Sequence, residues 1–107
     1  MTIQELSDIL RSVGCPVNEG VSSLKNEKTF PRIDYWEMAW EDDMASGLEY
    51  ETITTWQISF YAKKQALIDL RNILRDHGYH PLISHEFNVD DRIWHSYFTL
   101  ETVGEGL

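Results

Sequence analysis

The stretch TWQISFYAKK, residues 55–64, constrains the fold more than any other part of the sequence. Alternate residues in it are apolar and would share one face of an extended chain: Trp56, Ile58, Phe60 and Ala62. A period of two in aromatic and β-branched residues is typical of a strand with one buried face. The stretch ends in Lys63 and Lys64, although the chain has a formal net charge of -9. The sequence therefore predicts a half-buried strand that ends in two positive charges, although the molecule as a whole is negatively charged.

Two segments have the spacing of amphipathic helices. Near the N-terminus, Thr2 and Glu5 are spaced as in a capping box, and Gly14 and Pro16 end the apolar stripe that follows. The second helix ends before Gly78, and its apolar residues recur at helical spacing: Ala66, Leu67, Leu70, Ile73 and Leu74. Each helix must bury its apolar stripe against another element.

Further strands flank these helices. A short edge strand is expected near Val17, and a second strand at about 32–40. At the C-terminal end, two arms at about 82–87 and 92–103 are joined by a turn at 88–91. The sequence thus predicts a sheet built mainly from hairpins.

Residues 40–51, WEDDMASGLEYE, connect the second strand to the strand at 55–64. They hold five acidic residues and one glycine without a clear period, so a long hairpin loop and a bent strand pair both stay open. Connections of this length are uncommon unless they have a function. Because the acids repel one another, we expect this segment to be mobile in the isolated subunit and ordered on assembly.

The order helix, strands, helix, strands predicts an α+β fold, with a small, mainly antiparallel sheet, an N-terminal helix and a second helix packed on one face. A length of 107 residues without internal repeats predicts a single domain over residues 1–107. The residues expected in its core are Leu6, Leu10, Trp56, Ile58, Phe60, Leu70, Leu74, Trp94, Phe98 and Leu100.

The charge balance excludes several classes of partner. Lys and Arg number 9 against 18 Asp and Glu, and nucleic acids are bound largely by cations, so sequence-specific nucleic-acid binding is not expected. The same balance disfavours anionic membrane surfaces. No apolar run approaches the roughly 20 residues that cross a bilayer, and the first residues lack a signal-peptide pattern. Cys15 is the only cysteine, which fits a reducing, cytoplasmic setting.

No motif in the chain indicates catalysis. The four histidines, His77, His80, His85 and His95, do not match a zinc spacing, and the acids at 41–43 lack the spaced ligands of a calcium loop. A catalytic nucleophile motif and a phosphate-binding glycine loop are also missing from the sequence. We therefore expect a protein that is not an enzyme and binds no cofactor or metal.

Aromatic residues are more numerous than one small core readily hides: four Trp, five Tyr and four Phe. Part of this set fits an aromatic core. The rest indicates a surface for a protein partner, because Trp and Tyr commonly anchor such contacts.

Several runs together resemble a family of small tail-completion or head–tail joining proteins of long-tailed bacteriophages and prophages. They are Cys15-Pro16-Val17, FPRIDYWEM, ITTWQISFYAKK with its Tyr61-Ala62-Lys63 strand end, LIDLRNILRDHG and HEFNVDDRIWHSYFTL. The likeness covers most of residues 5–102. Two features depart from the family pattern: the acids at 41–43 add charge, and the gap between Lys64 and the helix is very short. Either would change which neighbour the protein meets.

The resemblance implies a structural virion protein that assembles as a ring, usually six-fold, at the head-proximal end of the tail tube. There it would cap the tube and help join the tail to the head connector, so the tail tube protein and the connector are its implied partners. Assembly would take place in the bacterial host cytoplasm. An acidic ring would also let DNA pass without sticking to it.

On this reading, the lysines at the strand end meet the acids of a neighbouring subunit. The residues expected at the subunit or partner interface are Trp40, Glu41, Asp42, Asp43, Tyr61, Lys63 and Lys64. An alternative function is a small intracellular protein-binding or regulatory module that uses an aromatic surface. A third is a metal-dependent enzyme built on the histidines.

Overall fold

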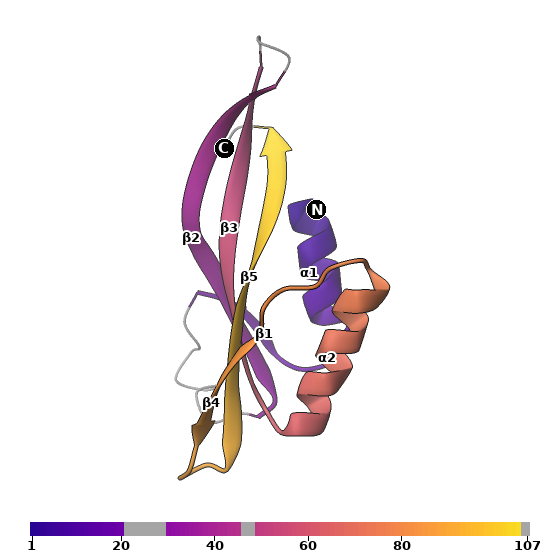
Figure 1. The fold of residues 1–107 in the computed structure, drawn as a ribbon, viewed down its shortest axis with the longest axis vertical. Helices are drawn as coiled ribbons and strands as arrows, with labels where there is room; N and C mark the ends of the chain where they lie inside the picture. Colours follow the sequence, from indigo (N-terminus) through magenta and orange to yellow (C-terminus); the bar gives the residue numbers. More distant parts are fainter. Residues whose placement is uncertain (21–29, 46–48, 106–107) are drawn as a thin grey trace.

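The computed structural model describes residues 1–20, 30–45 and 49–105, which form two helices and five strands (Figure 1). In chain order these elements are α1 (Ile3–Arg11), β1 (Val17–Glu19), β2 (Arg32–Ala45), β3 (Glu49–Ala62), α2 (Lys64–Asp76), β4 (Ser84–Asn88) and β5 (Ile93–Glu105). The strands make one sheet in the order β1-β2-β3-β5-β4. β1 runs parallel to β2, and the other neighbours are antiparallel. The predicted α+β class with a mostly antiparallel sheet is confirmed.

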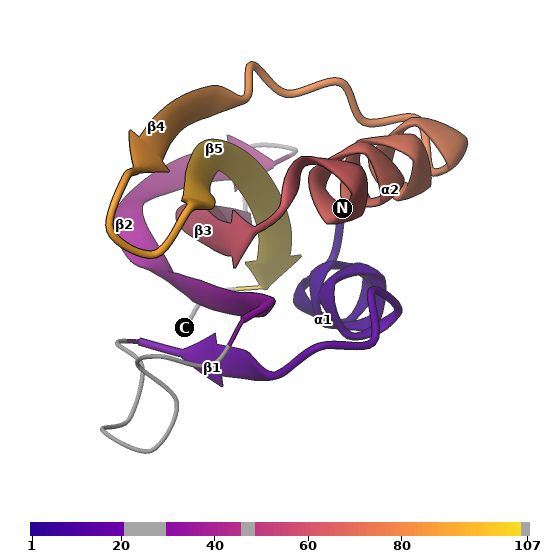
Figure 2. The ribbon, with the colours of Figure 1, turned by 90° about the horizontal axis from the view of Figure 1, so that it is seen from below.

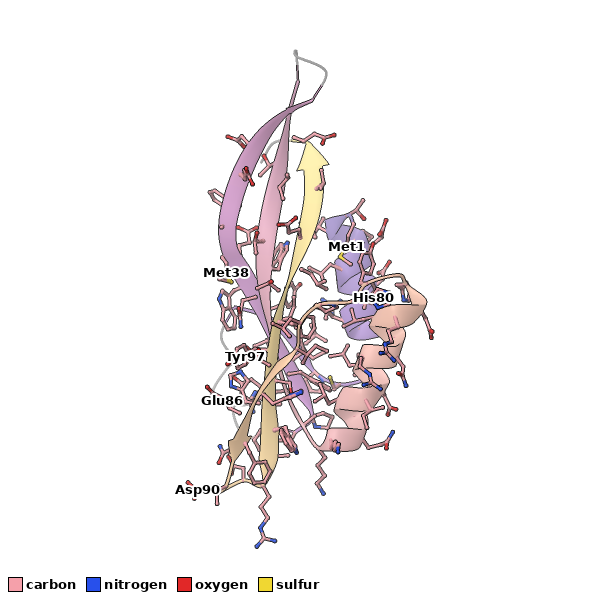
Figure 3. All side chains as sticks on the ribbon, viewed as in Figure 1. Met1, Met38, His80, Glu86, Asp90 and Tyr97 are labelled. Carbon is pink, nitrogen blue, oxygen red and sulfur yellow. The ribbon has the colours of Figure 1, made fainter. Side chains whose placement is uncertain are left out.

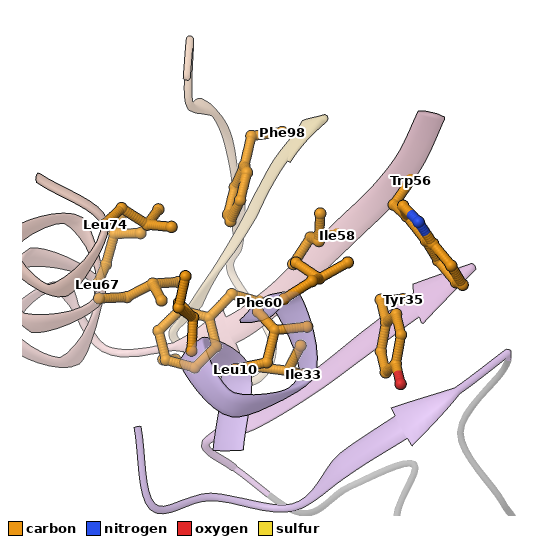
Figure 4. Packing of buried hydrophobic residues seen from close by; sticks show 13 residues of the cluster. Leu10, Ile33, Tyr35, Trp56, Ile58, Phe60, Leu67, Leu74 and Phe98 are labelled. Atoms are coloured by element: carbon orange, nitrogen blue, oxygen red, sulfur yellow. The ribbon is translucent and has the colours of Figure 1, made fainter. Parts of the chain in front are cut away.

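Both helices cover the same face of the sheet (Figure 2). Their apolar stripes meet the face of β3 that carries Ile58 and Phe60, and both of these side chains are fully buried. Figure 4 shows Leu10 of α1 and Leu67 and Leu74 of α2 closing over these two residues. The period of two in the stretch 55–64 therefore has the predicted cause, one face packed under helices.

The helix ends follow from single residues. The Thr2 hydroxyl oxygen accepts a hydrogen bond of 3.1 Å from the Glu5 N–H at the start of α1. At the end of α2, Gly78 adopts a φ of 85°, and its N–H donates to the Arg75 carbonyl at 2.9 Å. The Tyr79 N–H donates to the Leu74 carbonyl, also at 2.9 Å. This pair of bonds is a Schellman motif, which requires the positive φ that glycine adopts without strain.

The predicted core is largely confirmed, with two corrections. Trp94 and Leu100 are only half-buried, whereas the other eight predicted core residues are buried. Leu100 packs at the margin of the core cluster. Trp94 lies opposite Ala62 at one end of the sheet, where its ring contacts the ring of Phe87 at a centroid distance of 5.4 Å. The sequence period gave Trp94 the correct face, but the helices end before they cover it.

The acidic segment 40–51 forms a strand pair and not a loop. β2 continues through Ala45 and β3 begins at Glu49, with an unbroken ladder from Trp40 opposite Thr54 to Ala45 opposite Glu49. Residues 46–48 lie outside the described part of the chain. Of the two readings that the sequence left open, the strand pair is correct, and the mobility expected of this segment stays a prediction.

The β2–β3 hairpin gives the molecule its elongated shape, with extents of 52 × 30 × 21 Å. Figure 1 shows the far half of the hairpin projecting beyond both helices.

Candidate assembly surfaces

The first candidate surface lies on β2 beyond its pairing with β1, and we call residues 36–42 the hairpin arm. Three large apolar side chains are exposed on it: Trp36, Met38 and Trp40, with Trp40 63% exposed and Met38 56%. The acids Glu37, Glu41 and Asp42 are exposed beside them. Clustered exposed apolar side chains within a polar rim are typical of a protein-contact site.

A β-bulge explains why the arm presents aromatic residues on both faces. The register shifts between Glu37 and Ala39, so that Met38 is the extra residue of the bulge. Before the bulge, odd-numbered residues such as Tyr35 face the helices. After it, Trp40 lies opposite Thr54 on that same side. Trp36 and Trp40 therefore point to opposite faces of the sheet.

The outer edge of the arm has no partner strand among the residues the structure describes. β1 pairs with β2 only from Ile33 to Tyr35, so β2 forms the sheet edge from Trp36 onward. A long open edge is a template for pairing with another chain, and bulges and charged side chains are the usual protection against it. The bulge at Met38 and the exposed acids provide both.

The structure moves the two predicted interface lysines from a strand end to a helix start. β3 ends at Ala62, Lys63 is the N-cap residue of α2, and Lys64 is its first residue. Lys63 makes no side-chain capping bond, and the first turn of α2 holds no acidic residue. Because the helix dipole disfavours cations at an N-terminus, these lysines do not serve the stability of the helix.

The predicted interface acids lie far from these lysines within one chain. Arg32 opposite Tyr61 marks one end of the β2–β3 ladder, and Ala45 opposite Glu49 marks the other. Glu41 and Asp42 belong to the second end and the lysines follow the first. Asp43 is part of β2, but its side chain lies outside the described residues. A contact between the acids and the lysines therefore needs a second copy of the chain.

Tyr61, the remaining predicted interface residue, is engaged inside its own chain. Its ring stacks on that of His95, with a centroid distance of 4.4 Å and an interplanar angle of 9°. The Arg32 guanidinium lies 3.9 Å from the centre of the Tyr61 ring. The stack occupies the sheet face on which no described helix packs. Tyr61 is half-buried, so the expectation that it serves a partner surface has no support from its surroundings.

His95 is the titratable group that this stack affects most. Burial lowers its pKa below the ordinary value of 6.5, with Arg32 adding to the shift and Glu86 and Asp34 opposing it. The Nδ1 atom lies 3.8 Å from the Glu86 carboxylate, and Nε2 is buried with no hydrogen-bond partner among the described residues. A neutral ring with its proton on Nδ1 fits this arrangement, because Nε2 then has no N–H to leave unpaired.

The second candidate surface is a groove of about 540 Å³ between α2 and the segment 79–85, which we call the α2 groove. Leu67, Leu74 and Ile83 contribute to its apolar floor, and Leu82, 87% exposed, stands at its margin. The sequence did not indicate this groove, because it depends on how the segment after α2 crosses back over the helix.

The charged side chains that line the α2 groove are all cationic or histidine: Lys64, Arg71, Arg75, His80 and His85. The lining, drawn from the described residues, includes neither Asp nor Glu. Three of the nine Lys and Arg residues of an acidic chain thus gather around one apolar groove. Such a site favours a partner segment that is both apolar and acidic.

The histidines and the cysteine have local roles in the structure. His77 is the C-cap of α2, with Nδ1 2.9 Å from the Ile73 carbonyl, and His85 Nδ1 lies 2.9 Å from the Ser96 hydroxyl. Cys15 packs against the core, and burial raises the pKa of its thiol.

The described residues contain no group of three or more His, Cys, Asp and Glu side chains placed to hold a metal ion. Of the helices described, none has the length and apolar character needed to span a bilayer.

Comparison with known proteins identifies no family for this chain. No protein-family model matches the chain, and no curated protein matches its sequence.

Proposed function

We propose that the protein is a structural subunit of a long-tailed phage or prophage virion that forms a ring at the head-proximal end of the tail tube. In this position it caps the tube and helps to join the tail to the head connector. The phage setting and the six-fold number follow from the resemblance of residues 5–102 to tail-completion proteins. The observation that carries the assembly role is the hairpin arm, whose Trp40 and Met38 are exposed along the part of β2 that does not pair with β1.

Self-assembly is favoured because the two candidate surfaces complement each other and lie apart. The hairpin arm is aromatic and acidic, and the α2 groove is apolar and cationic. Two different complementary patches on one subunit make a heterologous contact, which closes into a ring when the rotation between subunits permits. A protein built this way has no need of a catalytic site or a cofactor.

The two lysines at the start of α2 support the same proposal. Lys63 and Lys64 are exposed at a helix end where their charge is unfavourable, and Lys64 lines the α2 groove. A partner with acidic side chains explains why two lysines stand at a helix N-terminus, where their charge destabilises the isolated subunit. The acids of a neighbouring hairpin arm, Glu41 and Asp42, are the partner of matching charge.

The alternative, a small intracellular protein-binding module, is favoured by the same exposed Trp36, Met38 and Trp40. The two functions differ in the mass of the complex. A ring subunit forms multimers of its own chain, whereas a module of this kind binds a different protein as a monomer or dimer. Sedimentation of the purified protein over a range of concentrations, and again with tail tubes present, separates them.

The test of the proposed function is to delete the gene from the phage or prophage that carries it and to image the particles by electron microscopy. We expect overlong tails or separate heads and tails, and normal virions when the wild-type gene is supplied in trans. Normal particles from the deletion would refute a role in tail completion.

A further inference from the structure

The α2 groove has the dimensions and chemistry of a binding site, and none of the described segments of its own chain fills it. Its volume of about 540 Å³ lies within the range of roughly 300 to 1,000 Å³ typical of ligand pockets. Its floor is apolar through Leu67 and Leu74, and its rim is cationic through Arg71 and Arg75. An occupant must therefore bring an apolar side chain for the floor and carboxylates for the rim.

The hairpin arm carries that combination. Trp40 is the most exposed aromatic side chain of the arm, and Glu41 and Asp42 follow it directly. The sequence of the arm, WEMAWED, contains no Lys or Arg. Trp40 Nε1 donates a hydrogen bond of 2.9 Å to the Glu37 carboxylate. The indole N–H therefore has a partner while the ring stays exposed.

We propose that the α2 groove of one copy receives the hairpin arm of a second copy, with Trp40 on the apolar floor and Asp42, on the same face of the arm, against the cationic rim. Glu41 adds its charge from the opposite face. This contact rests on the ring proposed above and names the surfaces that join one subunit to the next. A partner segment of a different virion protein would need the same chemistry, and the experiments below separate it from a second copy.

The positions of the two surfaces suit a head-to-tail contact. The arm lies on β2 near one end of the strand order, and the groove lies beside the segment that leads into β4 at the other end. Figure 3 shows Met38 of the arm and His80 of the groove well apart across the strands. A subunit can therefore offer its arm to one neighbour while its groove receives the arm of another. The contact is heterologous, and successive subunits propagate in one direction.

Docking of side chains explains the arm better than pairing of strand edges. Among the described strands none pairs with the edge of β2 from Trp36 outward, and the bulge at Met38 and the acids Glu37 and Glu41 interrupt a regular ladder. Natural edge strands use these devices to avoid pairing. They leave Trp40 free to enter a groove on another subunit.

Charge reversal tests the contact in solution. Arg71→Glu with Arg75→Glu makes the groove acidic, and Glu41→Lys with Asp42→Lys makes the arm basic. Each variant alone should lose self-association by on the order of tenfold or more, because like charges then face each other. An equimolar mixture should associate again, since each arm then meets a groove of opposite charge. Sedimentation of each variant and of the mixture at one protein concentration measures both effects.

The control variant is Asp90→Lys with Glu101→Lys, which reverses two exposed acids outside both surfaces. It changes the net charge as much as the arm variant does, and it should self-associate at least as well as the wild type. Loss of association in the control, or no recovery in the mixture, would overturn the proposed contact.

Cross-linking locates the contact directly. In a Cys15→Ser background, Met38→Cys, which keeps Trp40, together with Leu82→Cys should give disulfide-linked ladders on mild oxidation of the concentrated protein. Each single-cysteine variant should stop at dimers. Wild-type protein that remains a monomer at every concentration, or a double variant without ladders, would refute the contact between copies.

Failure here and failure of the proposed function give different results. If the groove and arm variants still make normal virions while the deletion does not, the protein completes tails through other surfaces. If an acidic segment of a connector or tube protein occupies the groove, cross-links to Leu82→Cys appear only in assembled particles and never between copies. Either outcome rejects the copy-to-copy contact and leaves the tail-completion role standing.

Discussion

The indole Nε1 of Trp40 donates a hydrogen bond of 2.9 Å to the Glu37 carboxylate, across the bulge centred on Met38. The bond joins two residues three positions apart and holds the Trp40 ring at the surface of the projecting hairpin. An exposed indole in a defined orientation resembles the aromatic anchors of protein interfaces. This one relationship connects the local backbone irregularity to the assembly surface.

Trp40→Ala should leave the free energy of unfolding of the isolated subunit unchanged within about 0.5 kcal/mol, because the ring is mostly exposed. The same variant should fail to assemble, since it removes the apolar anchor of the arm. Urea denaturation and sedimentation measure the two effects separately. A loss of several kcal/mol in stability would show that Trp40 supports the fold instead.

Ile58→Ala should lower the free energy of unfolding by about 2 to 5 kcal/mol, because the side chain is fully buried under both helices. Ile53→Ala is the matched control: Ile53 lies on the same strand, is half-buried and points to the other face, so its loss should cost less. Urea denaturation of both variants checks the face assignment. Equal costs would contradict it.

The stability of the subunit should fall as the pH drops below about 6.5, through the titration of His95. Its pKa is lowered in the folded chain mainly by burial, so the unfolded chain takes up a proton at a higher pH. The contribution is complete above the unfolded pKa of about 6.5 and is lost as the pH falls through the lower folded value. His95→Gln should flatten this part of a Tm-against-pH curve.

A slope between pH 7 and pH 5.5 that is as steep in His95→Gln as in the wild type would contradict this account.

Much of the fold could be predicted because local signals and the buried pattern agree. The alternation from Trp56 to Ala62, the capping pattern at Thr2 and the stop at Gly78 each predicted their element, and the structure confirms them. Where one face of a strand is packed under helices, its sequence must alternate.

The β2–β3 hairpin could not be predicted in the same way. Here the buried face of β3 carries Thr52 and Thr54 in place of the alternating apolar residues that mark a strand. The bulge at Met38 also exchanges the two faces partway along β2, so Trp36 and Trp40 lie on opposite faces although both are even-numbered. A single period fitted to residues 32–40 has no means of detecting that change.

The candidate surfaces could be predicted only in part. The acids Glu41 and Asp42 and the two lysines are exposed, and their role at an interface stays a prediction. The ring of Tyr61 contacts His95 and Arg32, residues from two other strands, which a local pattern does not indicate. The sequence does not indicate the α2 groove, because Arg71, Arg75 and Leu82 come together only when the chain after Gly78 crosses back over α2. Charge clusters of this kind depend on tertiary structure.

Lys63→Glu with Lys64→Glu should block assembly while leaving the subunit folded. Acidic residues at the N-terminus of a helix interact favourably with its dipole, typically by about 0.3 to 1 kcal/mol each, so the variant should melt at the same temperature or slightly higher. The neutral pair Lys63→Gln with Lys64→Gln should assemble weakly. Thermal melting and sedimentation report the two effects, and normal assembly of the Glu variant would exclude the lysines from the subunit contact.

The central claim is that this chain forms a ring that ends a tail tube. The most direct measurement is electron microscopy of purified tail tubes, together with the rate of tube elongation, before and after the protein is added. The account predicts a closed ring at one end of each tube and an arrest of further polymerisation, both absent with Trp40→Ala. Bare tube ends with elongation at an unchanged rate, or protein bound along the tube wall, would contradict it.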